Sequence, residues 1–317
     1  MEYLSFRNGD RMPAVGLGTW KAGPDEVYGA VREAIRAGFR HIDCAPIYDN
    51  EPAVGAALSD AIGAGEVRRD QLWITSKLWN SDHHRDRVQP ALESSLRDLG
   101  LEYLDLFLVH WPVALRAGVG FPTHADDFLS EAQAPRGETW QGMEHCARIG
   151  LARHIGVSNF SVTKLAALMA ACEIAPEVNQ VEAHPYLQQD SLLDYCRAHG
   201  IHLTAFSPLG SPDRSPATKG ADEPSLLADP VIAAIAERHG VGPARVLLAW
   251  HVQRGAAVIP KSVDPAHLRD NLAAAGLRLD TRDLAAIADL DQNYRFIRGS
   301  FLAIEGSPHT AATLWDD

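Results

Sequence analysis

The sequence lacks the segments that mark membrane-spanning and exported proteins. No stretch is apolar for long enough to cross a bilayer, and the opening segment, MEYLSFRNGDRMPAV, contains no apolar core of signal-peptide length. Cysteine is scarce too, and no two of the four cysteines follow the C-x-x-C spacing. Such isolated thiols (Cys44, Cys146, Cys172 and Cys196) argue against a disulfide framework or a zinc site. We therefore expect a reducing compartment, with the cytoplasm as the default.

Positive charge is also in short supply. Lysine and arginine number 29 against 41 aspartates and glutamates, which gives a net charge of −12. This balance repels nucleic acid and anionic membranes, and the longest basic cluster, Arg85-Asp86-Arg87, is interrupted by an acid. We expect neither kind of partner. Apolar residues make up 46% of the chain, which is enough for the full core of a globular protein.

What the chain does contain is a regular alternation of short apolar strands and amphipathic helices. An Asn8-Gly9 turn signal first predicts a β-hairpin between residues 4–7 and 11–12. The predicted strands then cover residues 15–19, 39–43, 72–76, 103–109, 154–157, 177–181, 201–206 and 257–259. The predicted helices cover residues 25–37, 51–61, 86–99, 138–149, 161–170, 188–199, 230–239, 243–253, 265–273 and 283–290.

Eight strand–helix units of this kind predict a single α/β fold, the (β/α)8 TIM barrel. Strands that are apolar throughout are buried on both faces, as in a parallel sheet covered by helices. No Pro/Gly/Ser-rich linker divides the chain, so we expect one domain over residues 1–317, with the hairpin closing its amino-terminal end. The irregular stretches 111–137 and 207–229 follow strands and belong on the carboxyl-end face, where barrel active sites lie. The tail, residues 292–317, is expected to form a substrate-side loop.

Polar residues at strand ends are the catalytic candidates in a barrel. Asp43 ends the second predicted strand, Lys77 the third and His110 the fourth, and Tyr48 lies in the loop after the second. A lone lysine after a strand usually has no catalytic role and only lies where the chain leaves the core. Here, however, three adjacent strands deliver polar groups at equivalent heights beside a phenol, and this joint pattern favours an active site.

The group suits proton donation to a carbonyl oxygen. A free tyrosine has a pKa of about 10, which is too high for ready donation near neutrality. We expect the Lys77 ammonium to lower the pKa of Tyr48, and Asp43 to keep the lysine charged despite partial burial. His110 is expected to orient a substrate carbonyl or to relay the proton. The chain has neither a G-x-S-x-G nucleophile motif nor an H-E-x-x-H metal motif.

Two other motifs are weaker. The His83-His84 pair has no partner at metal-ligand spacing, so we expect an exposed loop there and no metal site. The segment GLGTWK begins like a dinucleotide fingerprint, but Lys21 replaces its third glycine, so it does not predict a Rossmann site.

A better anion site lies late in the chain. Lys261 and Ser262 end the last predicted strand, and the next helix has Pro265 near its start. A lysine, a serine and a helix amino terminus together bind phosphate, and barrels frequently hold a phosphate after strands seven and eight.

Taken together, these motifs resemble the aldo-keto reductases, in the branch of the aldose and aldehyde reductases. The similarity runs from Gly9 to about Asn293 and includes, in the family's order, GLGTW, GFRHIDCAPIYDNE, ITSKLW, YLDLFLVHWP, GVSNF, VNQVEAHPY, FSPLGSPDR and IPKS. It implies a (β/α)8 barrel without a Rossmann fold that binds an extended NADP(H). It also implies hydride transfer that reduces an aldehyde, aldose or ketone carbonyl to the alcohol.

The resemblance implies roles for individual residues as well. The residues that match the catalytic tetrad, with the general acid first, are Tyr48, Asp43, Lys77 and His110. Those that match the substrate pocket are Trp20, Trp79, His110 and Trp111. Those that match cofactor contacts are Thr19, Trp20, Lys21, Ser158, Asn159, Gln180, Phe206, Ser207, Leu209, Ser211, Asp213, Lys261, Ser262, His267, Asp270 and Asn271.

Within the cofactor set, the implied contacts follow the length of the dinucleotide. The residues that match those holding the nicotinamide carboxamide are Ser158, Asn159 and Gln180, and Phe206 matches the aromatic residue that stacks on its ring. The residues that match the loop over the pyrophosphate are Ser207, Leu209, Ser211 and Asp213. Lys21 and Lys261 would pair with Asp213 and fasten that loop across the cofactor.

One end of the implied cofactor site departs from the family's pattern. NADPH-preferring relatives hold the 2′-phosphate with an arginine in the last helix, and His267 stands at that position. Asp264 stands where relatives have a neutral residue, and an anion there would repel a phosphate. Asp270 and Asn271 match adenine contacts. We hypothesise that NADP(H) binds with weakened discrimination and that NAD(H) is also used.

Other functions are compatible with the resemblance. The enzyme could work mainly as an NAD(P)+-dependent alcohol or polyol dehydrogenase. Relatives of this fold also serve as non-catalytic, cofactor-sensing regulatory subunits of potassium channels, although the match favours an enzyme. The sequence indicates a small carbonyl compound as substrate without specifying which, and related reductases include monomers and dimers.

Overall fold

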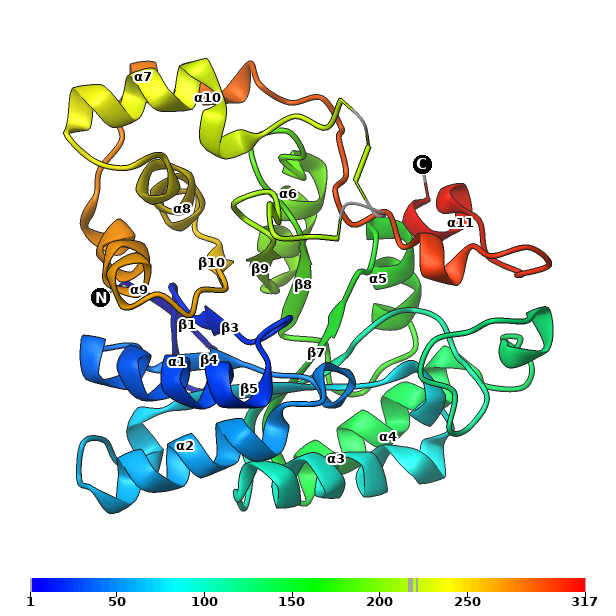
Figure 1. Ribbon diagram of the computed structural model, residues 1–317. Coiled ribbons are helices and arrows are strands. Elements are labelled where there is room, and N and C mark those ends of the chain that lie inside the picture. The colour runs from blue at the N-terminus through cyan, green and yellow to red at the C-terminus, as the bar shows by residue number, and fades with distance from the viewer. Residues whose placement is uncertain (1, 216–218, 221, 317) are drawn as a thin grey trace.

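Eight parallel strands curl into a barrel with helices around it (Figure 1). The computed structural model describes residues 2–215, 219–220 and 222–316. The strands follow one another around the sheet in chain order: β3 (Leu17–Gly18), β4 (His41–Asp43), β5 (Trp73–Leu78), β6 (Leu104–Val109), β7 (Ala152–Ser158), β8 (Val178–Glu182), β9 (His202–Phe206) and β10 (Ala257–Val258). Parallel bridges from Val15 to Val258 and from Gly18 to Lys261 close the ring. The predicted (β/α)8 barrel is confirmed.

Helices connect the strands and cover the outside of the barrel (Figure 1). They are α1 (Pro24–Ala37), α2 (Glu51–Gly63), α3 (Arg85–Leu99), α4 (Arg136–Arg148), α5 (Val162–Met169), α6 (Asp190–His199), α7 (Pro230–His239), α8 (Pro243–Gln253), α9 (Pro265–Ala273) and α10 (Thr281–Ala288). Every residue of β5 and β6 is buried, as expected for strands covered on both faces. In the described part of the chain, no helix is both long and apolar enough to cross a membrane.

The amino-terminal hairpin closes the end of the barrel where the strands begin. It consists of β1 (Tyr3–Ser5) and β2 (Arg11–Pro13), paired antiparallel. Gly9 has a φ of 93° in the turn, a conformation that glycine adopts without a steric penalty. Met12 is fully buried and clusters with Trp73 and Val178, the first residues of β5 and β8. The cluster confirms that the hairpin plugs the amino-terminal end.

The tail contains regular structure although its sequence shows no hydrophobic periodicity. It contains a 3-10 turn at Ser300–Leu302 and ends in the short helix α11 (Ala311–Trp315). Lys164 on α5 forms a 2.7 Å ion pair with Asp316, and Figure 1 shows α11 beside α5. Five residues are too few to display a helical period, so this element was missed. Residues 216–218 and 221 of the predicted loop and residue 317 of the tail lie outside the described part of the chain.

Candidate active site

A buried ion pair lies where β4 and β5 end. Lys77 Nζ donates to Asp43 Oδ1 at 2.5 Å and to the carbonyl oxygen of Cys44 at 2.8 Å. Tyr48, at the end of a 3-10 turn that begins at Pro46, has its Oη 3.4 Å from the same Nζ. Asp43 and Lys77 are almost fully buried. The structure therefore brings an acid, an ammonium and a phenol together, as the strand ends indicate.

The strand ends are offset in register. The register pairs Asp43 with Thr75, two residues before Lys77, and pairs Lys77 with Leu108, two residues before His110. Barrel strands are tilted, so register partners do not lie at one height along the barrel axis. The lysine side chain spans the register offset and reaches Asp43. From across the barrel, Gln180 on β8 donates Nε2 to Asp43 Oδ2 at 2.7 Å. Both carboxylate oxygens are thus held.

The electrostatics of the group favour a protonated phenol. Burial raises the pKa of Tyr48 to about 12, and the nearby Lys77 ammonium offsets only part of that effect. The expectation of a net lowered tyrosine pKa is therefore wrong for this structure. Burial alone would lower the pKa of Lys77, but the Asp43 carboxylate outweighs it and raises that pKa above its usual value. Near neutral pH the lysine is charged and the tyrosine carries its proton.

His110 follows β6 and faces the phenol. Its ring centroid lies 5.9 Å from that of Tyr48 and 5.1 Å from that of Trp79, in both cases edge to face. Burial lowers the pKa of His110 well below its ordinary value, and the Lys77 charge lowers it further. The imidazole is therefore neutral. Its Nδ1 is buried without a hydrogen-bond partner in the described part of the chain.

Aromatic side chains from three segments meet above these groups. Trp111 packs against Phe301 and Trp315 of the tail, with ring centroids 5.3 and 5.7 Å apart. Phe121, in the long loop after β6, contacts Phe301 at 5.5 Å and Trp79 at 5.7 Å. We call these five residues the mouth cluster. The family resemblance named the two that follow β5 and β6, whereas the sequence analysis missed Phe121 in the long loop and the two in the tail.

Within the described part of the chain, Trp20 is not part of the mouth cluster. Its side chain is 39% exposed, and Lys21 Nζ lies 4.1 Å from the centre of its ring. The structure therefore brings two of the three predicted pocket tryptophans together and leaves Trp20 at the rim of the loop after β3.

The residues at the end of β7 form a polar cradle beside His110. Asn159 donates Nδ2 to the His110 carbonyl oxygen at 2.9 Å, and Ser158 donates Oγ to the Gln180 carbonyl oxygen at 2.7 Å. Asn159 has a φ of 64°, which is rare for a residue other than glycine. Its Oδ1 is buried and has no partner in the portion of the chain described. A free acceptor of this kind fits an amide N–H such as that of a nicotinamide carboxamide.

The loop after β9 is fastened to the ends of β10 and β3, the next two strands around the closed barrel. Asp213 forms ion pairs with Lys21 at 2.9 Å and with Lys261 at 3.3 Å, so it joins the loop after β3 to the end of β10. Ser207 and Ser211, both with positive φ, hydrogen-bond to each other through Oγ at 3.2 Å. We call residues 207–213 the strap. Phe206 and Leu209, at its start, are half-buried.

The helix amino terminus beyond β10 is already capped by a carboxylate. Asp264 Oδ1 accepts the N–H groups of Ala266 at 2.7 Å and of His267 at 2.9 Å. These hydrogen bonds hold the pKa of Asp264 below its usual value. His267 is exposed, so the position where relatives carry an arginine offers an imidazole at the surface. The cap uses N–H groups that would otherwise be free for a phosphate.

The remaining residues of this end lie around α9. Lys261 and Ser262 are half-buried, and Ser262 Oγ accepts the N–H of Asp264 at 3.1 Å. Asp270 pairs with Arg245 of α8, and Asn271 is buried. Lys261 and Ser262 therefore lie beside the capped amino terminus, as the sequence indicates. Thr19 directly follows Gly18, which bridges to Lys261, and it donates Oγ1 to the Asp43 carbonyl oxygen at 2.8 Å.

Comparison with known proteins agrees with this geometry. A sequence model of the aldo/keto reductase family matches residues 14–292. The chain belongs to the aldo/keto reductase family. The Aldo/keto reductase slr0942 of Synechocystis sp. (strain ATCC 27184 / PCC 6803 / Kazusa) is 51% identical over 317 residues, which is 100% of this chain and 97% of the relative. Aldo-keto reductase family 1 member A1 of Mus musculus and that of Homo sapiens are each 44% identical over 294 residues, 92% of this chain and 90% of the relative.

This aldo/keto reductase is therefore an oxidoreductase, and its family generally uses NADP(H). The cradle at Asn159, the strap and the Lys261 end are compatible with such a dinucleotide. Which residues contact it, and whether NAD(H) is also used, stay predictions.

The reductase differs from the sequence expectation at His83. The side chain is 1% exposed, so the prediction of an exposed loop is wrong. Burial lowers the pKa of His83 to about 3, and neither ring nitrogen has a partner among the described residues. Within that same part of the chain, no group of three or more His, Cys, Asp or Glu side chains is arranged to hold a metal ion.

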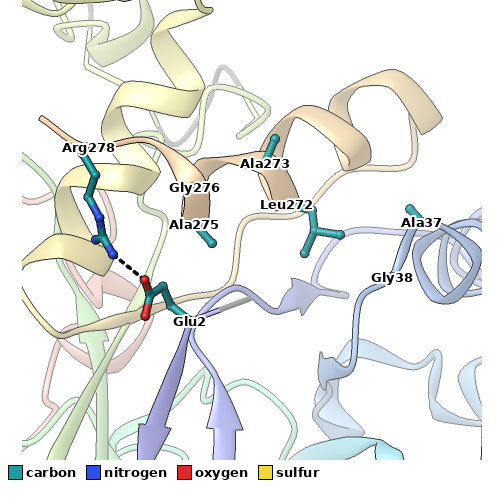
Figure 2. A pocket seen from close by; sticks show the side chains of 8 residues that line it. All are labelled: Glu2, Ala37, Gly38, Leu272, Ala273, Ala275, Gly276 and Arg278. Atoms are coloured by element: carbon teal, nitrogen blue, oxygen red, sulfur yellow. Dashed lines mark hydrogen bonds and ion pairs between the residues drawn. The ribbon is translucent and has the colours of Figure 1, made fainter.

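A separate pocket lies on the opposite side of the reductase (Figure 2). Its lining residues are Glu2, Ala37, Gly38, Leu272, Ala273, Ala275, Gly276 and Arg278. They include the carboxyl ends of α1 and α9, and helices in this fold run antiparallel to the strands. The pocket is therefore at the amino-terminal end of the barrel. Glu2 and Arg278 form an ion pair across it, and it is not part of the candidate active site.

Proposed function

We propose that this aldo/keto reductase reduces an aldehyde, aldose or ketone to the alcohol, with Tyr48 as the proton donor. NADP(H), when bound, supplies the hydride. One observation carries the proposal: a phenol lies 3.4 Å from the ammonium of a fully buried Lys77–Asp43 pair. A carbonyl oxygen that gains negative charge during hydride transfer needs a proton, and Tyr48 Oη holds one.

The surrounding residues have distinct tasks in this proposal. Lys77 stabilises the phenolate that remains after proton donation, and Asp43 and Gln180 hold the lysine in place. Neutral His110 offers a ring N–H to the carbonyl oxygen without adding a charge that would repel Lys77. Ser158, Asn159 and Gln180 would hold the carboxamide of the nicotinamide, Phe206 would stack on its ring, and the strap would lie over the pyrophosphate.

We further propose how the chain is organised and where it works. Residues 1–317 form one domain, with the tail as a substrate-side loop, because Phe301 and Trp315 contact Trp111 beside His110. The cytoplasm is the proposed location, since the four cysteines are all free thiols. The proposed partner is a small carbonyl compound, and the proposed oligomeric state is a monomer or a dimer.

Replacing the proton donor tests the function. Tyr48→Phe removes one oxygen atom and keeps the ring, so kcat with NADPH and a simple aldehyde should fall by about 10²–10⁴. The change in protein fluorescence on NADPH binding should remain. Turnover close to that of the wild type would reject Tyr48 as the acid, and the absence of any NADPH oxidation by the wild type would reject carbonyl reduction.

A further inference from the structure

A fully buried carboxylate holds the start of the tail at the mouth of the barrel. Glu182, the last residue of β8, accepts the N–H of Phe296 on Oε1 at 2.6 Å and that of Ile297 on Oε2 at 2.8 Å. The Nε2 of His184, also buried, lies 2.9 Å from Oε1. Hydrogen bonds to an ionised acceptor are stronger than neutral ones, and two of them to successive residues fix both the position and the direction of a segment.

The held segment leads directly into the mouth cluster. Ile297 packs with Trp79 and Trp111 in the same apolar cluster. Gly299 turns with a φ of 69°, and a Cβ there would lie 3.3 Å from the Trp111 ring. Phe301 then places its ring against Trp111. Only a few residues therefore separate the Glu182 hydrogen bonds from the side chains that line the mouth.

The same strand also supports the catalytic carboxylate. Gln180, two residues before Glu182, donates to Asp43 Oδ2 at 2.7 Å. Residues two apart on a strand point to the same face, and Val178 of that row belongs to the cluster inside the barrel. One face of β8 thus joins Asp43 to the tail through two side chains.

We propose that Glu182 is a positioning residue that sets the tail as a wall of the substrate pocket and so selects carbonyl substrates by their apolar bulk. The inference rests on the proposed function. A wide aromatic aldehyde fills the space up to the tail and depends on where Glu182 holds it. A short aliphatic aldehyde reaches Tyr48 and His110 without touching the tail.

Glu182→Gln tests the inference because it preserves size and removes one acceptor. The amide offers one oxygen for two N–H groups and turns its NH2 toward the other. With NADPH, kcat/KM for naphthaldehyde should fall at least about tenfold more than kcat/KM for propanal, mainly through KM. Hydrogen exchange at the amides of residues 296 and 297 should accelerate.

Glu144 provides a matched control. It is buried on α4, and its Oε1 accepts the N–H groups of Glu173 at 2.7 Å and Ile174 at 2.9 Å, in the loop that leads to the amino-terminal end of β8. Glu144→Gln makes the same substitution at a buried carboxylate away from the mouth. Its amide oxygen can still accept both N–H groups, and its NH2 replaces the Oε2 that pairs with Arg148. It should leave the naphthaldehyde-to-propanal ratio as in the wild type.

The outcomes separate the inference from the proposed function. A wild type that reduces neither aldehyde refutes carbonyl reduction itself. A wild type that reduces both, with the same ratio in Glu182→Gln as in Glu144→Gln, refutes the positioning role. If Glu182→Gln does not fold, Glu182→Asp is measured instead. It keeps both oxygens on a shorter stem, and an unchanged ratio together with unchanged exchange at residue 297 refutes the inference equally.

Discussion

The two ends of the barrel each hold a cluster of charged groups around a buried side chain, His154 at one end and Lys77 at the other, and the two clusters differ in how fully they are paired. At the amino-terminal end, His154 lies 2.8 Å from Glu177 and 3.0 Å from Asp10, so both ring nitrogens have carboxylate partners. At the mouth, the Lys77–Tyr48 contact is long, at 3.4 Å. A fully paired cluster stabilises the fold, whereas groups with spare bonding capacity can bind a ligand.

Backbone strain shows the same contrast. Positive φ costs free energy in residues other than glycine, and such residues gather where structure is used for binding. Several of them belong to loops at the carboxyl-end face: Lys21, Asp49, Asn159, Ser207 and Ser211. In the hairpin at the other end, the positive φ falls on Gly9, where it costs little. Backbone strain is therefore concentrated in the loops at the mouth of the barrel.

The largest expected effect comes from breaking the group of Asp43, Lys77 and Tyr48 at the mouth. Lys77→Met leaves Tyr48 without the ammonium that stabilises its phenolate, so kcat should fall by about 10²–10⁴. Steady-state NADPH oxidation with an aldehyde measures it, and circular dichroism checks that the barrel folds. A fall of less than about tenfold would show that the ion pair is structural and would remove the contrast between the two ends.

Breaking the cluster of His154, Glu177 and Asp10 should lower the stability of the fold and leave kcat unchanged. Burial alone would lower the pKa of His154, but the hydrogen bonds and negative charges of Glu177 and Asp10 together outweigh it, so this pKa is raised. The stabilisation is therefore complete below the unfolded histidine pKa of about 6.5 and is lost as pH rises through the folded value. His154→Gln should lose about 1–3 kcal/mol of unfolding free energy at pH 6 and less at pH 9.

Urea unfolding at both pH values measures this loss, and kcat well below the melting temperature serves as the control. Other titratable groups also lie near this cluster: Asp10, Arg153, Glu177 and His202. Burial would raise the pKa of Asp10, but His154 outweighs it and lowers that pKa, so its contribution is lost on acidification. The contribution of Asp10 changes only in acid. If the loss of unfolding free energy in His154→Gln were larger at pH 9 than at pH 6, the assignment to His154 would be contradicted.

Releasing the strap should have a smaller effect, which is on cofactor binding and not on stability. Asp213→Asn removes both ion pairs, which are partly exposed, so the Kd for NADPH should rise by about threefold to tenfold. Fluorescence titration measures Kd, and unfolding in urea should be nearly unchanged. An unchanged or lower Kd would show that the strap does not enclose the cofactor.

The smallest effect concerns cofactor choice. Wild-type kcat/KM should favour NADPH over NADH by less than about a thousandfold, which is about 4 kcal/mol. Asp264→Ser keeps a helix-capping oxygen and removes the anion, so the preference for NADPH should rise by about twofold to fivefold. A wild-type preference above that limit would reject use of both cofactors.

The parts predicted well from sequence are those fixed by local physics. The bounds of α7 and α9 agree with the prediction because each helix begins with an aspartate cap followed by proline, at Asp229-Pro230 and Asp264-Pro265. Asp43 and Lys77 were found because apolar strands end on them. Their ion pair forms because neighbouring strands bring both side chains to the same end of the barrel and the long lysine side chain reaches Asp43.

The parts missed depend on contacts between distant segments. His83 lies in a loop with no period, so nothing local showed that it is buried. Phe301 and Trp315 become pocket candidates only when the tail folds back over Trp111. Glu182 reads as an ordinary strand end, and its role depends on N–H groups more than a hundred residues later. The tyrosine pKa was misjudged because the extent of its burial is a tertiary property.

The two lysine–aspartate contacts of the strap make the reductase sensitive to its ionic surroundings. Lys21, Asp213 and Lys261 are 23%, 44% and 27% exposed at their side chains, so dissolved salt reaches them. At about 0.15 M salt, screening acts over a distance of about 8 Å, and it strengthens as salt rises. Added salt thus loosens the strap while leaving the buried Lys77–Asp43 pair intact. On the proposed role of the strap, ionic strength should change how quickly the dinucleotide is exchanged and leave the proposed proton donor, Tyr48, unaffected.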